Sequence, residues 1–111
     1  MTAELISERA ARHVAAFNDS VRSGEWADFA ARFTPAATMC FVGIPAGPFT
    51  GREAIAAGYV SQPPSDTLTV THGVSSGDVD ELWFAWDNGS TGTMILRWSD
   101  DLIAELTVTF N

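Results

Sequence analysis

Residues 48–60 have the sequence PFTGREAIAAGYV, which is typical of a turn that starts a short helix. Thr50 is the expected N-cap, because its hydroxyl can accept a hydrogen bond from the backbone N–H of Glu53. Ile55 and Tyr59 then fall on one face of the helix, one turn apart. The stretch therefore predicts a short helix that directs one tyrosine toward the interior.

The pattern of apolar residues differs on the two sides of this stretch. Before it, apolar spacing of three and four predicts helices over residues 6–22 and 25–32, and a strand follows at 37–42. After Pro63-Pro64 the alternation is that of strands, and Asn88-Gly89 is a strong hairpin signal. Four strands are predicted in the second half, at residues 67–74, 82–87, 91–98 and 102–110. Helices followed by an antiparallel meander predict an α+β fold.

Length and charge limit the classes of function. The 111 residues are expected to form a single domain, 1–111. Six arginines, no lysine and fourteen acidic residues give a net charge of −8, which argues against binding to nucleic acid or to anionic membranes. The sequence has no apolar run long enough to span a membrane. With one cysteine and no signal-peptide pattern at the N-terminus, a cytoplasmic location is expected.

Three short segments resemble a known superfamily. They are FNDSVRSGEW at residues 17–26, FTPAAT at 33–38 and FTGREAI at 49–55. Together with the order of the predicted elements, they resemble the nuclear transport factor 2-like (NTF2-like) superfamily, which includes SnoaL-like polyketide cyclases, ketosteroid isomerases and limonene epoxide hydrolases. The resemblance implies a cone-shaped, curved antiparallel sheet wrapped around three helices of the N-terminal half. It also implies an apolar pocket and a homodimer paired through the outer face of the sheet.

Two chemistries known in this superfamily find no matching residues. Alignment places Phe41, Phe17 and Met94 where ketosteroid isomerases have a base, a tyrosine and a protonated aspartate. None of these three side chains exchanges a proton. The epoxide hydrolase pattern needs an arginine between two carboxylates, and the late strands offer Arg97 with no paired aspartate.

Three polar residues are the candidates for catalysis by proton transfer. Tyr59 is expected to donate a hydrogen bond, His72 to act as general acid or base, and Asp87 to act as a base. Each also has a simpler structural interpretation. Tyr59 would be a packed aromatic residue, His72 a core or rim histidine held by the backbone, and Asp87 a turn residue before the hairpin.

The strand at residues 82–87 can be placed in two registers. Hydrophobicity places Trp86 inward with the leucine and phenylalanine before it, whereas alignment with the superfamily places Trp83 and Asp87 inward. Because a slip of one residue turns every side chain to the other face, the sequence leaves both registers open.

The remaining candidates concern the pocket and metal binding. Apolar and aromatic residues with one histidine are predicted to line the pocket: His13, Phe17, Phe41, Trp83, Met94, Leu106 and Phe110. Core and dimer packing is the simpler interpretation for most of the aromatic residues. No metal site or cofactor is predicted, because His13, His72 and Cys40 share no ligand spacing. The acidic run at residues 78–81 is expected to lie on a solvated hairpin face.

Two functions follow, and both are kept open. In the first, a small enzyme of SnoaL or isomerase type acts on an apolar or polycyclic molecule by proton transfer. In the second, a non-catalytic dimer holds an apolar ligand or serves as a structural subunit. A purely protein-binding scaffold is a third interpretation and requires a further apolar patch. The first two differ in whether an acid and a base meet inside one pocket.

Overall fold

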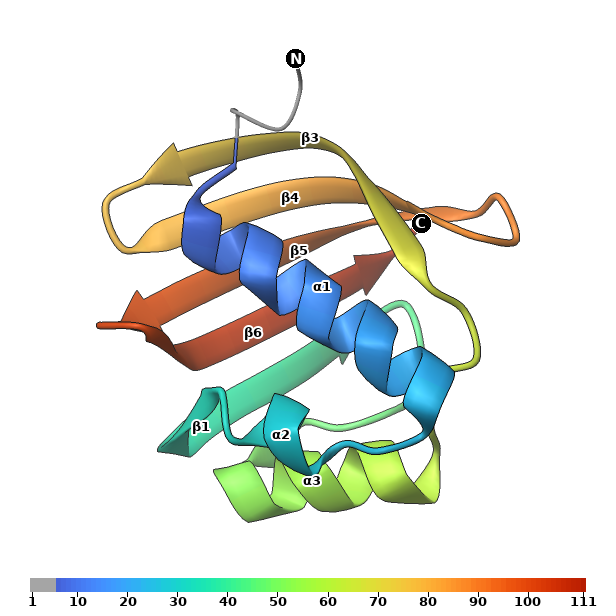
Figure 1. Ribbon diagram of the computed structural model, residues 1–111, viewed down its shortest axis with the longest axis vertical. Helices are drawn as coiled ribbons and strands as arrows, with labels where there is room; N and C mark the ends of the chain where they lie inside the picture. The colour runs from blue at the N-terminus through green and yellow to red at the C-terminus, as the bar shows by residue number, and fades with distance from the viewer. Residues whose placement is uncertain (1–5) are drawn as a thin grey trace.

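The computed structural model describes residues 6–111, in which three helices lie on one face of a curved sheet (Figure 1). The prediction that no signal peptide begins the chain concerns residues outside this range. The elements in order are α1 (Glu8–Ser23), α2 (Ala27–Ala30), β1 (Phe33–Val42), β2 (Phe49–Thr50), α3 (Arg52–Ser61), β3 (Leu68–Ser76), β4 (Val79–Trp86), β5 (Thr91–Ser99) and β6 (Leu102–Phe110). This arrangement confirms the predicted α+β fold.

Within these residues the sheet has six strands in the order β2-β1-β6-β5-β4-β3. β1 pairs with β6 in parallel, and the other neighbours are antiparallel. The expectation of a purely antiparallel sheet is therefore corrected to a mixed one, because the first long strand runs in the same direction as the last. The predicted four-strand meander is present as β3 to β6.

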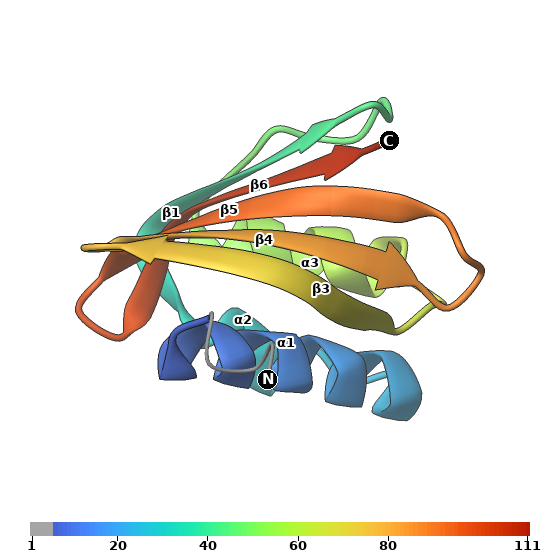
Figure 2. The ribbon, with the colours of Figure 1, turned by 90° about the horizontal axis from the view of Figure 1, so that it is seen from above.

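The helices are packed on the concave side of the sheet. Viewed from above, α1 and α2 lie together along one side of the curved strands, and α3 is seen behind the strands, farther from the viewer (Figure 2). α1 packs against β3, and α3 packs against β1. None of the helices in residues 6–111 has the length and apolar character needed to cross a bilayer.

α1 forms where apolar spacing predicts a helix. Its N-cap is Ser7, whose hydroxyl accepts a hydrogen bond from the Ala10 amide at 3.1 Å. Gly24 ends the helix with a φ of 77°, a conformation that glycine adopts without steric cost. The buried stripe includes His13 and Phe17, which α1 turns toward the sheet. The predicted second helix is shorter than expected and is limited to α2.

The start of α3 differs from the prediction. Thr50 is not the N-cap, because its backbone belongs to β2 and pairs with Thr38 of β1. The N-cap is Gly51, which has a φ of 94° and makes no side-chain cap. The predicted inward face is nevertheless present, since Ile55 and Tyr59 are both buried.

The register of β4 is the one that hydrophobicity favours. Leu82 and Phe84 are buried, and Asp87, just beyond the strand, is exposed. The register from the superfamily alignment is therefore corrected. The alternating side chains of the strand place the large apolar residues against the helices, which is the arrangement that buries more apolar surface.

β3 contains an irregularity that alternation alone does not predict. The pairing register with β4 shifts between Val70 and His72, as in a β-bulge. The extra residue reverses the faces beyond it, so Gly73 is buried and His72 is exposed. Strict alternation along this segment predicts an inner face shared by Val70, His72 and Val74, and the irregularity corrects that prediction because His72 and Val74 are exposed.

Asp80 on β4 joins the first helix to the sheet. Its side chain is 1% exposed and accepts hydrogen bonds from Ser7 Oγ at 2.7 Å, Trp98 Nε1 at 2.8 Å and the hydroxyl of Ser75. A buried carboxylate with three donors is a satisfied polar network. The expectation of a solvated hairpin face is wrong for Asp80, because in the observed register Asp80 shares the inner face with Leu82.

Candidate functional site

The structure forms a cavity of about 360 Å³, open to solvent, between the concave face of the sheet and the helices. This volume is at the lower end of the range of small-molecule sites, about 300–1,000 Å³. The inner wall is apolar and is formed by side chains from every long strand, among them Met39, Leu68, Phe84, Met94 and Val108. The outer wall is formed by connecting segments, which contribute Ile44, Ala46, Gln62, Pro64, Ser65, Asp66, Asn88 and Ser90.

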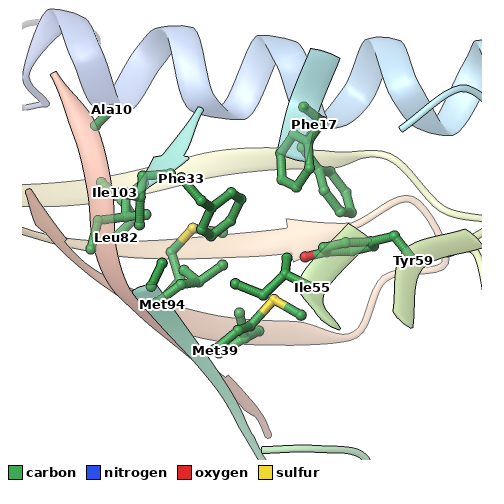
Figure 3. Packing of buried hydrophobic residues seen from close by; sticks show 14 of the residues in the cluster. Ala10, Phe17, Phe33, Met39, Ile55, Tyr59, Leu82, Met94 and Ile103 are labelled. Carbon is green, nitrogen blue, oxygen red and sulfur yellow. The ribbon is translucent and has the colours of Figure 1, made fainter. Parts of the chain in front are cut away.

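Tyr59 brings one hydroxyl group to the cavity from α3. Its ring stacks on Trp26 with centroids 4.5 Å apart and meets the edge of Phe29 at 5.2 Å. Figure 3 shows the hydroxyl pointing into the cluster of buried side chains. Within residues 6–111 no hydrogen bond involves this hydroxyl. Burial raises the pKa of Tyr59 above its usual value, so the hydroxyl stays protonated and can donate.

His13 brings an imidazole to the same cavity from α1. The side chain is 1% exposed and lies 5.2 Å from the Phe29 ring and 6.4 Å from the Phe33 ring, measured between centroids. Its Nδ1 atom has no hydrogen-bond partner within the described part of the chain. Burial, with a smaller contribution from the charge of Arg32, lowers the pKa of His13 from 6.5 to about 3.

These two groups make the interior neutral at physiological pH. A neutral imidazole has one N–H donor and one acceptor nitrogen, and a neutral phenol is mainly a donor. General acid–base catalysis is most efficient when the pKa of the catalytic group is near the working pH, and neither group meets that condition. Of the residues described, the one carboxylate in the lining is that of Asp66, at the edge of the cavity. The geometry is suited to holding and orienting a neutral polar group.

The structure places most of the predicted lining residues at the cavity. Those that line it are His13, Phe17, Phe41, Met94, Leu106 and Phe110. Trp83 does not, because β4 turns it to the other face of the sheet, where its ring lies 5.1 Å from that of His72.

Of the three catalytic candidates, the structure brings Tyr59 alone to the cavity. His72 is exposed on the outer face because of the irregularity in β3. Asp87 is exposed at the base of the hairpin, where its carboxylate accepts a hydrogen bond from the Thr67 hydroxyl and its amide donates to the Thr67 carbonyl at 3.0 Å. The three side chains therefore do not converge.

Several lining residues were not singled out from the sequence. Phe49 follows β1 in the chain and packs its ring against Phe41 at 6.2 Å, and Trp86 stacks on Phe110 at 5.8 Å. The sequence was sufficient to predict Trp86 as a lining residue, because the register of β4 that hydrophobicity favours turns its side chain inward. Asp66 and its neighbours come from an irregular segment, for which periodicity gives no direction.

Comparison with known proteins supports the fold. No protein-family model matches the chain, and no curated protein matches it. Among solved structures, a SnoaL-like protein of unknown function from Burkholderia thailandensis has a TM-score of 0.75 at 11% identity, covering 96% of this chain and 98% of that one.

Two further solved structures are similar. A protein from Catenulispora acidiphila with a ketosteroid isomerase-like fold, in complex with trimethylamine, has a TM-score of 0.72 at 15% identity over 89% of this chain and 85% of that one. A proposed ketosteroid isomerase from Kribbella flavida has a TM-score of 0.68 at 18% identity over 95% and 79%. At these identities the similarity concerns the fold, which is that of NTF2-like proteins.

Proposed function

On this NTF2-like fold, we propose that the chain binds a small apolar molecule in the cavity between the sheet and the helices. The observation that carries the proposal is an apolar cavity of about 360 Å³ whose lining includes two neutral polar side chains, Tyr59 and His13. Among the described residues the Tyr59 hydroxyl makes no hydrogen bond, and the Nδ1 of His13 is buried without a partner. Polar groups inside a protein are normally hydrogen-bonded, so a tyrosine hydroxyl without a partner in the lining supports a ligand that completes its hydrogen bond.

The chemistry of the lining indicates the class of ligand. The body of the ligand packs on aromatic and aliphatic side chains, and an oxygen such as a carbonyl accepts from the Tyr59 hydroxyl. A cavity at the lower end of the size range supports a compact molecule of one or two rings over a large polycyclic one. The trimethylamine bound by the Catenulispora acidiphila protein supports including small amines among the compounds tested.

Binding without catalysis is supported over proton transfer. In an isomerase-type reaction, Tyr59 would stabilise a developing oxyanion by hydrogen bonding. Such a reaction also needs a base, and the histidine in the interior has its pKa lowered to about 3. The enzyme hypothesis therefore depends on Asp66, the one carboxylate of the described lining, which lies at the edge of the cavity.

The homodimer stays part of the proposal. The outer face of the sheet exposes two large apolar side chains, Val74 at 48% and Ile95 at 42%, which pair across the strands with Glu81 between them. Apolar residues gathered on one face support pairing of two copies there. Sedimentation equilibrium tests this: the wild-type chain should be a dimer, and Ile95→Glu should shift it to monomer. A wild-type monomer at micromolar concentration would contradict the pairing.

The binding proposal is tested with a matched pair of ligands, 2-tetralone and tetralin, which differ by one carbonyl oxygen. Tyr59→Phe should weaken the ketone by about fivefold to tenfold, as expected for one lost hydrogen bond, and leave the hydrocarbon unchanged. Titration calorimetry measures both. Equal affinity of the variant and the wild type for 2-tetralone would refute the role given to Tyr59, and no binding of either compound would count against the cavity as a site.

A further inference from the structure

The charge in the described lining of the cavity is of one sign, negative. Of the described residues that line it, Asp66 is the one with an ordinarily charged side chain, and no arginine is among them. Two arginines are bonded elsewhere: Arg9 donates to the Asp100 and Gly77 carbonyls, and Arg52 donates to the Phe33 carbonyl. Arg32 lies outside the lining, and its charge acts on the cavity only through its effect on His13.

Asp66 lies where the cavity meets its polar edge. It is half-buried, and it is two residues before Leu68, which pairs with Trp86 across β3 and β4. The same edge carries Asn88 from the hairpin, and the Asp87 amide bonds the Thr67 carbonyl there. The backbone of Asp66 thus lies next to the end of the strand that presents the Trp86 ring.

Aromatic rings continue from this edge into the cavity. Trp86 stacks on Phe110 at 5.8 Å, and Phe110 lies 6.0 Å from Phe41. The faces of such rings attract cations, and the attraction strengthens when the cation is partly desolvated. Deeper inside, His13 is part of the lining, and its Nδ1 is buried in the packing without a partner among the described residues. The cavity therefore combines an aromatic wall with one carboxylate at its edge.

We infer that the preferred ligand is an amphiphilic amine, whose apolar body fills the cavity and whose protonated amine lies at the edge against Asp66 and the Trp86 ring. This inference rests on the proposed binding function and adds the charge of the ligand to it. An acid of the same shape is excluded by the carboxylate, because like charges repel and no arginine of the described lining compensates.

The test uses three probes with one naphthalene body: 1-naphthylmethylamine, 1-naphthalenemethanol and 1-naphthoic acid. Calorimetric titration at pH 7 should rank the amine first, the alcohol second and the acid last. Asp66→Asn should weaken the amine by about threefold to tenfold and leave the alcohol unchanged. The amine should also bind more weakly as salt is added, while the alcohol is insensitive to salt.

A matched control separates the local carboxylate from the net charge. Asp101→Asn removes one negative charge at an exposed turn between β5 and β6, so it should leave all three affinities unchanged. If the alcohol binds as tightly as the amine, or if Asp66→Asn does not weaken the amine, the inference about charge is refuted and the binding function stands. If none of the three probes binds, the binding function itself fails, and the inference fails with it.

Discussion

Replacing His13 with phenylalanine should remove much of the sensitivity of the fold to acid between pH 6 and pH 4. His13 is 1% exposed and is packed between Phe29 and Phe33, so its charged form has lost its contact with water. Phenylalanine keeps a flat ring of similar size and has no proton to bind. The substitution therefore removes the titration while it preserves the packing.

The magnitude follows from the pKa of His13 in the two states. The pKa is about 3 in the folded protein and 6.5 in the unfolded chain. Between these values the unfolded chain binds one proton more than the folded protein, so the free energy of unfolding decreases as the pH falls. The contribution is fully present above pH 6.5 and is lost toward pH 3. From pH 6 to pH 4 it amounts to a loss of about 2.5 kcal/mol.

Urea unfolding, followed by tryptophan fluorescence at pH 6, 5 and 4, measures this loss. His13→Phe should have a shallower decrease in the free energy of unfolding than the wild type, whatever its stability at pH 7. His72→Gln is the matched control, because His72 is exposed, and its decrease should match that of the wild type. Parallel curves for the wild type and His13→Phe would refute the assignment of a buried, neutral His13.

Two further predictions concern positions at which the packing leaves little freedom. Asp80→Ala should lower the free energy of unfolding by about 3 kcal/mol or more, because it leaves the Trp98 indole N–H and two hydroxyls without their acceptor. Urea titration measures this loss, with the exposed Asp101→Ala as the control, and equal losses in the two variants would contradict the network. Gly92→Ala should lower the free energy of unfolding by about 1–3 kcal/mol, since its new methyl group would lie 2.6 Å from a backbone oxygen and 2.7 Å from the Phe84 ring. An unchanged melting temperature would contradict this prediction and would mean that the strands move apart at this point.

Much of the fold could be predicted because local patterns and packing agree. α1 has apolar residues at helical spacing, a serine cap and a terminal glycine, and all three act at the observed positions. The Asn88-Gly89 turn joins two strands that alternate as expected. In β4 the apolar pattern indicated the observed register, and the superfamily alignment did not, because alignment at low similarity does not resolve a shift of one residue.

The parts that could not be predicted depend on contacts between distant residues. Pairing with Thr38 of β1 keeps Thr50 extended and prevents it from capping α3. The irregularity in β3 is defined by a shift in its pairing with β4, which the sequence of β3 alone does not contain. It turns His72 away from the cavity. Asp80 is buried because donors from α1, β3 and β5 meet it, and no local pattern contains that information. The predicted site therefore lost His72 and Asp87 beside irregular segments, and it lost Trp83 because the alignment gave the wrong register for β4.

The most direct test of the proposed function is to observe a ligand inside the cavity. Met39 and Met94 both line it, so their ¹³C-labelled methyl groups are reporters for NMR. Adding 1-naphthalenemethanol should shift both resonances saturably. Ala46→Trp, which narrows the cavity at its outer wall, should abolish the shifts, while Ala57→Trp on the exposed side of α3 should not. Resonances that stay unchanged up to the solubility limit, or shifts that persist in Ala46→Trp, would contradict binding in this cavity.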